Sequence, residues 1–361
     1  MIQLNRFKAS LEDAGLDGAI ISSELNQRYL CDFPFTDGYI LVLPEKSYLL
    51  TDFRYAEAIK KAVSGFEIIC PEGRMSDCIA DLTRKSKAKS LAVEEDSISL
   101  GEFELLAEKL GGIATLKSGA SAILLAQRAI KLDYEIERIK KAQEITDAAF
   151  SHIITFVEEN KSSLTERDVA LELDFFMQKQ GSEGVAFETI AISGDATSLP
   201  HGVPRNEKLK NGFLTMDFGA KFDGYCSDMT RTVVIGRADD EIKCLYNTVL
   251  SAQLAALDFL REGVDAGEAD KVARDIIDAA PEYNGAFGHS LGHSVGLFIH
   301  ESPALTKKAF GRALRVGEIV TVEPGIYLFG KYGCRIEDMV AIEKDGVYNF
   351  THSTKELIEI Y

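Results

Sequence analysis

The chain has 361 residues, a length that favours two domains over a single core. Its formal net charge of -17 disfavours nucleic acid and anionic membranes as partners, because both attract basic surfaces. The N-terminus lacks the basic and apolar pattern of a signal peptide, and no apolar stretch is long enough to span a bilayer. We therefore expect a cytoplasmic protein.

The first part of the chain alternates helical and strand-like segments. Apolar residues at helical spacing predict helices over 5–14, 55–63 and 75–84. Short apolar runs predict strands over 19–22, 38–44, 47–51, 66–69 and 90–93. This alternation predicts a small mixed α/β domain.

After residue 120 the pattern changes to longer helices. An apolar stripe at steps of three or four residues predicts a helix over 130–157. A second helix is predicted to begin at Thr165, because Thr165 and Asp168 form a capping pair, and to end at Gly181. Two further helices are predicted among short strands, at about 241–261 and 268–280. We place the boundary after residue 122, which gives domains of 1–122 and 123–361.

Two aspartates lie in strand-like segments on either side of a turn signal. The segments 214–218 and 229–235 flank Asp223-Gly224, which favours a tight hairpin. The hairpin would place Asp217 and Asp228 nearly opposite each other. Like charges that face each other across a hairpin are destabilising, so this pair predicts a neutralising cation or base.

The same arrangement is predicted a second time downstream. Strands over 319–323 and 335–342 would make Glu323 and Glu337 face each other. Any one of the four acids alone is explained as a solvated side chain near a turn. As a set, embedded among apolar strand residues, they predict a cup that two divalent cations neutralise.

Histidines cluster close to the second acidic pair. His289, His293 and His300 fall within twelve residues, and His201 precedes the first hairpin. Imidazole is a borderline ligand that suits Zn, Fe, Co and Mn. We expect one histidine of the cluster to bind metal and another to polarise a substrate carbonyl. His201 and His289 could orient that carbonyl or stabilise an oxyanion.

These motifs resemble those of the pita-bread metallopeptidases, and most closely the branch of aminopeptidase P and prolidase. In the second half the resemblance is carried by SLPHG, MDFGA, GYCSDMTRT, GHSVGLFIHESP, VEPGIY and RIEDM. In the first half it is carried by LNQRYLCDF, DGYILV and LLTDFRY, which resemble a creatinase-type domain. The resemblance implies an α+β chain with a small mixed α/β creatinase-type N-terminal domain followed by a pita-bread catalytic domain.

The resemblance also implies a role for each matching residue. Two divalent metal ions per chain would be bound by five ligands, Asp217, Asp228, His293, Glu323 and Glu337. Carboxylate-dominated ligation favours manganese, with cobalt or zinc as alternatives. Glu323 would also be the acid/base for the water shared by the two ions.

Four further residues match positions around the metals in that family. His201 and His300 match histidines that contact the substrate and the tetrahedral intermediate, and His289 matches a histidine near the proline pocket. Arg335 matches an arginine that braces the glutamate ligand and an active-site aspartate. Phe298 departs from the pattern, because the family often has Glu there; this changes the electrostatics of the cleft and not the ligands.

The activity implied is hydrolysis of the N-terminal Xaa-Pro bond of peptides by a metal-bridging hydroxide. The partners would be short peptides with proline in the second position and a second copy of the chain in a homodimer. The alternative within the class is a prolidase restricted to dipeptides. Creatinase, which uses the fold without metal, and non-enzymatic pita-bread binding proteins are more remote, because all five ligands are present.

Overall fold

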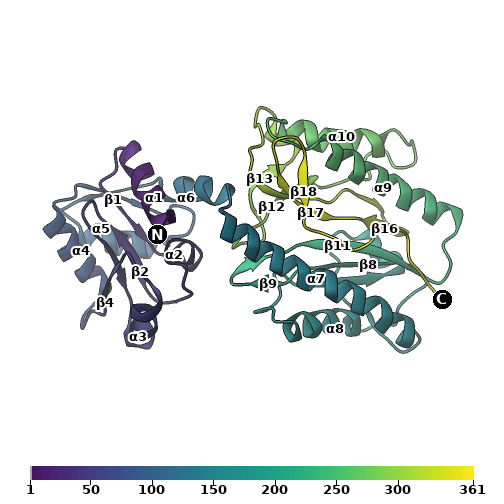
Figure 1. Ribbon diagram of the computed structural model, residues 1–361, viewed down its shortest axis with the longest axis horizontal. Helices are drawn as coiled ribbons and strands as arrows, with labels where there is room; N and C mark the ends of the chain where they lie inside the picture. The colour runs from purple at the N-terminus through teal and green to yellow at the C-terminus, as the bar shows by residue number, and fades with distance from the viewer. Residues whose placement is uncertain (1) are drawn as a thin grey trace. The chain divides into compact units, whose positions relative to one another are not determined.

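The computed structural model describes residues 2–361, and the chain divides into two compact units between Arg128 and Ala129 (Figure 1). The predicted boundary after residue 122 falls inside helix α6 (Ala120–Ala129), before this division. Over the described residues, no helix is both long and apolar enough to cross a membrane.

The first unit is built around a mixed sheet with the strand order β4-β3-β2-β1-β5-β6. Strand β1 pairs antiparallel with β2 and parallel with β5. The strands are β1 (Gly18–Ile21), β2 (Tyr39–Val42), β3 (Ser47–Leu50), β4 (Glu67–Ile69), β5 (Ser90–Val93) and β6 (Thr115–Lys117). The helices are α1 (Ile2–Asp13), α2 (Glu24–Cys31), α3 (Phe53–Ala62), α4 (Met75–Ser86), α5 (Leu100–Lys109) and α6.

The prediction of a mixed α/β unit is confirmed, but four of its elements were not predicted. Helix α2 was missed although Ser23 caps it, with the Ser23 side chain accepting from the Asn26 backbone N–H. Helices α5 and α6 and strand β6 were also missed. The short α2 and β6 offer too few residues for a clear apolar period.

The first half of the second unit packs two long helices against one sheet. Helices α7 (Asp133–Asn160) and α8 (Glu166–Lys179) lie beside strands β8 and β11 (Figure 1). The sheet order is β19-β11-β8-β7. Its elements are β7 (Ile190–Ser193), the 3-10 helix η1 (Gly194–Ser198), β8 (Gly212–Phe218), β11 (Met229–Ile235) and β19 (Glu359–Ile360), with the small hairpin β9 (Lys221–Phe222) and β10 (Tyr225–Cys226).

The predicted signals for this half are confirmed in their main features. The apolar stripe of α7 is buried: Ile139, Ala142 and Ile153 are fully enclosed, and Ala149 and Ile153 pack with residues of the sheet. Thr165 caps α8, and its backbone N–H donates to Asp168 in return. The long helix begins at Asp133 and not at residue 130 as predicted, because the first turn starts after the extended residue Leu132.

The second half repeats this layout with a different pair of helices. Helices α9 (Asp240–Phe259) and α10 (Ala266–Asp278) pack on the sheet β13-β12-β14-β17-β18. Its elements are β12 (Gly292–Ser294), β13 (Glu301–Leu305), η2 (Lys307–Ala309), β14 (Ile319–Val322), β17 (Asp338–Ile342) and β18 (Val347–Asn349), with the hairpin β15 (Gly325–Leu328) and β16 (Tyr332–Arg335). The second unit is therefore two helix-covered sheets, and each carries one of the predicted acidic pairs.

Candidate metal centre and active site

Strand pairing sets the position of the two aspartates. Asp223 and Gly224 have φ of 48° and 83°, which makes the two-residue turn between β9 and β10 that the sequence predicted. Asp217 pairs with Thr230, and Met229 pairs with Phe218. Asp228 comes directly before β11, so it lies diagonal to Asp217. The prediction that the two aspartates are nearly opposite is corrected to a diagonal arrangement.

The two glutamates lie at the ends of a second antiparallel pair. Val322 pairs with Asp338, so Glu323 and Glu337 occupy the next positions beyond that pair. The prediction of one continuous strand over 335–342 is wrong, because the strand is interrupted at Ile336 and Glu337, between β16 and β17. This break lets β15 and β16 form a hairpin of their own, while both glutamates still reach the same cavity.

Strand β12 and a tight loop bring two histidines together. His293 lies on β12, and the register with β13 shifts between His293 and Ser294. The chain then turns back, so that the ring centroids of His293 and His300 are 4.5 Å apart. The reversal explains why residues seven apart share one site, which a continuous strand would not allow.

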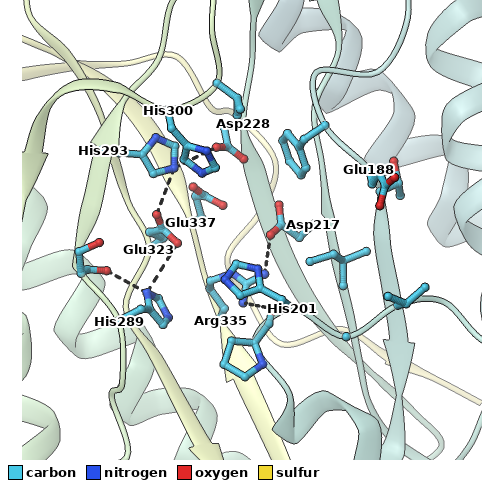
Figure 2. A pocket seen from close by; sticks show the side chains of 18 of the residues that line it. Glu188, His201, Asp217, Asp228, His289, His293, His300, Glu323, Arg335 and Glu337 are labelled. Atoms are coloured by element: carbon cyan, nitrogen blue, oxygen red, sulfur yellow. Dashed lines mark hydrogen bonds and ion pairs between the residues drawn. The ribbon is translucent and has the colours of Figure 1, made fainter. Parts of the chain in front are cut away.

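The predicted residues converge on one cavity of about 450 Å³. Figure 2 shows His293 between two of the acids, with its Nε2 3.5 Å from Asp228 Oδ2 and 3.4 Å from Glu323 Oε1. Ligand atoms of Asp228, His293 and Glu337 all lie within 4.8 Å of one another. The cavity lining includes every predicted site residue: Asp217, Asp228, His293, Glu323, Glu337, His201, His289, His300 and Arg335.

Burial makes this group of carboxylates electrostatically costly. Burial and then the charge of Glu337 raise the pKa of Asp228 well above its usual range. Burial and then the charge of Glu323 do the same to the pKa of Glu337. Burial raises the pKa of Glu323 to about 8. Protons or cations are therefore needed to stabilise this group of carboxylates.

The donor set fits divalent metal ions. Asp217 Oδ1 is buried and accepts no hydrogen bond from the protein, so one carboxylate oxygen points into the site without a protein partner. Burial and the neighbouring His300 lower the pKa of His293 to about 4, which leaves a neutral imidazole with a free lone pair. Carboxylate oxygens with one neutral imidazole suit hard to borderline divalent ions. The match of these residues to a metal is therefore chemical as well as positional.

Arg335 connects predicted metal ligands from both sheets. Its Nη2 donates to Asp217, and its Nε donates to Thr230 Oγ1 at 2.9 Å. Thr230 Oγ1 in turn donates to Glu337 Oε2 at 2.7 Å. The Nη1 of Arg335 donates to the Tyr327 hydroxyl at 2.8 Å. The guanidinium therefore orients two predicted ligands, one directly and one through a threonine.

Two other predicted histidines border the cavity in different settings. His289 Nε2 lies 2.9 Å from the Tyr327 hydroxyl, and burial followed by the charge of Arg335 lowers its pKa to about 3. His201 is exposed on the loop after η1. Arg205, later in that loop, binds the buried carboxylate of Glu166 through Nε and Nη2 at 2.8 and 2.7 Å. This ion pair fixes the segment that carries His201.

A buried ion pair supports the histidine loop from behind. Lys131 Nζ donates to Ser294 Oγ at 2.8 Å and lies 3.4 Å from Glu301 Oε2, and both charged side chains are 1% exposed. Glu301 Oε1 accepts from the Phe298 backbone N–H at 3.1 Å. Ser294 follows His293 and Glu301 follows His300, so the pair holds both ends of the loop.

Several of these supporting residues were not predicted from the sequence. Thr230 and Tyr327 lie inside motifs that were used, GYCSDMTRT and VEPGIY, but a threonine or tyrosine in a strand has no distinctive signature. Lys131 is 163 residues from Ser294, and no local pattern connects them. No sequence pattern identified Phe187, Glu188 and Val203, which also line the cavity.

Comparison with known proteins matches both units. The profile of Metallopeptidase family M24 matches residues 137–344, and that of the Creatinase/Prolidase N-terminal domain matches residues 3–130. The chain is 34% identical over 350 residues to the Xaa-Pro dipeptidase of Pyrococcus horikoshii, covering 96% of both chains.

Solved structures agree over almost the whole length. The chain is similar to an Xaa-Pro dipeptidase from Bacillus anthracis, with 38% identity, a TM-score of 0.94 and 99% of both chains covered. It is also similar to an X-Pro aminopeptidase from Thermotoga maritima, with 34% identity, a TM-score of 0.90, and 96% of this chain and 98% of that chain covered. The expected fold and activity class are confirmed: the chain belongs to metallopeptidase family M24, with a creatinase-type N-terminal domain, a pita-bread catalytic domain and the activity of a hydrolase.

Proposed function

We propose that this peptidase is an Xaa-Pro aminopeptidase, which removes the N-terminal residue before proline from peptides longer than two residues. The observation that carries the length preference is the charge of the cavity. Among the described residues that line it, Arg335 is the only lysine or arginine. Its guanidinium is already bound to Asp217, Thr230 and Tyr327.

The two kinds of substrate differ in the charge that follows proline. In an Xaa-Pro dipeptide the proline carries a free carboxylate, and a buried anion without a cation is costly to desolvate. In a longer peptide the same position is a neutral amide. A cavity without an uncommitted lysine or arginine therefore favours the longer peptide.

We propose two divalent metal ions per chain, held by Asp217, Asp228, His293, Glu323 and Glu337. The abundance of carboxylates favours manganese over cobalt or zinc. Ions bound there supply Lewis acidity for the scissile carbonyl and a water of lowered pKa. The buried carboxylates, with their raised pKa values, support this ligand set.

The side chains around the metals would position the substrate and move the proton. Glu323 faces the cavity with its side chain only 15% exposed, so its carboxylate can accept a proton from water and deliver it to the proline nitrogen. His201 and His300 are exposed to the cavity and can donate to the carbonyl oxygen. His289, beside Tyr327, would border the proline ring.

Assembly and location are also proposals. The resemblance of both domains to aminopeptidase P and prolidase supports a homodimer that acts in the cytoplasm. Sedimentation velocity at several protein concentrations tests the assembly. A single species with the mass of one chain would contradict the dimer.

Turnover of peptides of increasing length tests the proposed preference. The substrates are Ala-Pro, Ala-Pro-Ala and Ala-Pro-Ala-Ala, with Ala-Ala-Ala-Ala as the control without proline. We expect kcat/KM to be at least about tenfold higher for the longer proline peptides than for Ala-Pro, because a buried polar group without a partner costs about 1–3 kcal/mol and a charged group costs more. The control should not be cleaved.

The second candidate is a dipeptidase, since two of the similar proteins are named Xaa-Pro dipeptidase. Hydrolysis of Ala-Pro with exclusion of Ala-Pro-Ala-Ala would establish this alternative. Loss of the proline requirement would contradict both.

A further inference from the structure

Glu188 lies in the irregular segment that leads into β7, and it lines the active-site cavity. Val185 pairs with Ala220, and Ile190 pairs with Asp217. Five residue steps on one strand therefore face three on the other, which is a bulge that contains Glu188. Bulges next to active sites redirect side chains, and this one places Glu188 in the cavity lining.

The bulge is fixed from behind by a partly buried hydrogen bond. Thr189 Oγ1 donates to Asp174 on helix α8. Asp174 is half-buried, and burial raises its pKa. The neighbour of Glu188 is therefore anchored to the helix layer, while Glu188 itself is exposed to the cavity.

The Glu188 carboxylate differs from the other acids of the cavity in its position and in its binding partners. Figure 2 shows it on the side of Asp217 away from Glu323 and His293. Within residues 2–361, no lysine, arginine or backbone N–H is bound to it. Under the proposed function the four ligand carboxylates are committed to metal, so Glu188 is the acid of the cavity lining that is available for a substrate cation.

We propose that Glu188 is a specificity-determining residue whose carboxylate binds a lysine or arginine side chain of the peptide substrate. The wall beside it is apolar, formed by Phe187, Ile190 and Val203, and suits the methylene stem of such a side chain. This inference rests on the proposed Xaa-Pro peptidase function. The cation belongs either to the residue before proline or to the residue after it.

Four matched peptides separate these two sources. Lys-Pro-Ala-Ala and Glu-Pro-Ala-Ala vary the first residue, and Ala-Pro-Lys-Ala and Ala-Pro-Glu-Ala vary the third. We expect wild-type kcat/KM to favour the lysine peptide over the glutamate peptide in one of the two series. Glu188→Gln should reduce that preference about three- to fivefold, the range of a partly exposed ion pair. The loss should appear in KM, because the contact lies away from the reacting bond.

Charge reversal sharpens the test. Glu188→Lys should favour the glutamate peptide of the same series, and added salt should weaken both preferences. Glu159→Gln and Glu159→Lys are the matched controls, since Glu159 is an exposed acid at the end of α7 outside the cavity. They should leave all four kcat/KM values unchanged.

The inference is overturned if Glu188→Gln and Glu188→Lys have the same lysine-to-glutamate ratio as wild type in both series. Hydrolysis of Ala-Pro-Ala-Ala by wild type tests the peptidase function separately. Calorimetric binding of the four peptides to Glu323→Ala, with and without Glu188→Gln, gives the same comparison without turnover. These measurements distinguish an incorrect role for Glu188 from an incorrect reaction.

Discussion

Glu323 has three properties that suit proton transfer in one side chain. It is enclosed beside the cavity, its Oε1 lies 3.4 Å from His293 Nε2, and it accepts from Thr321 Oγ1 at 3.2 Å. In the metal-free protein burial raises its pKa to about 8, so a metal ion bound there would have to displace a proton from it at neutral pH.

Replacement of Glu323 tests the proposed catalytic role. Glu323→Ala is expected to lower kcat/KM for Ala-Pro-Ala-Ala by at least about 1,000-fold, because it removes a ligand and the proton carrier together. Circular dichroism and thermal melting should show an intact fold. Retained activity in a folded variant would contradict the assignment.

The raised carboxylate pKa values predict how stability of the metal-free protein depends on pH. The folded state holds a proton on Glu323 up to about 8, whereas the ordinary value is 4.5. This stabilisation is complete below 4.5 and is lost as the pH rises through about 8; the raised pKa values of Asp228 and Glu337 act in the same direction. Thermal melting of chelator-treated protein should therefore show a lower Tm at about pH 8.5 than at about pH 5.5.

Manganese should reverse this trend by taking the place of the protons. Calorimetry in buffers of different ionisation enthalpy should detect proton release on metal binding at neutral pH. A metal-free protein whose Tm rises over this pH window would contradict the buried carboxylate cluster.

At the level of elements, the loop between β12 and β13 depends on the buried Lys131–Glu301 pair. Lys131→Met removes the cation beside the buried Glu301 carboxylate, which is expected to cost about 3 kcal/mol or more. Because the pair holds both ends of the loop, manganese affinity should also fall about tenfold. Lys141→Met is the matched control, since Lys141 is an exposed lysine on α7 that forms an ion pair with Glu144 at the surface. Chemical denaturation and metal titration measure the two effects.

An unchanged metal affinity in a destabilised Lys131→Met protein would show that the pair supports the fold and not the site. Lys131→Arg, which keeps the charge, should restore part of the affinity.

The elements also show how far the sequence could be interpreted. Long helices such as α7 and α8 were predicted because their apolar period and capping residues are local. The turn at Asp223-Gly224 was predicted for the same reason. The break at Glu337 was missed, since it depends on β15 and β16 pairing with each other and not on any residue at the break.

The residues of the site also divide into those that local sequence predicts and those that it does not. Asp217, Asp228, Glu323 and Glu337 were found because a charge in an apolar strand is costly wherever the strand lies. Lys131 and Thr230 were not, because their roles come from contacts 163 and 107 residues away in sequence. Glu188 depends on a bulge, which alternation along a strand does not predict.

At the scale of the whole molecule, the proposed metal ions would join the two sheets of the second unit. Asp217 and Asp228 come from the sheet of β8 and β11, and Glu323 and Glu337 from the sheet of β14 and β17. Metal binding should therefore protect these four strands from hydrogen exchange. The first unit, which contributes no predicted ligand, should change little. Uniform protection of both units, or none, would contradict a metal centre between the two sheets.

The most direct test of the central claim is the rate of Ala-Pro-Ala-Ala hydrolysis as a function of manganese bound per chain. Protein stripped by a chelator and reloaded in steps is assayed for alanine release, and bound metal is measured in the same samples. We expect no hydrolysis without metal and full activity at two ions per chain, with Pro-Ala-Ala as the second product. Activity that survives complete metal removal, or no cleavage after Xaa in the fully loaded protein, would contradict a dinuclear Xaa-Pro peptidase.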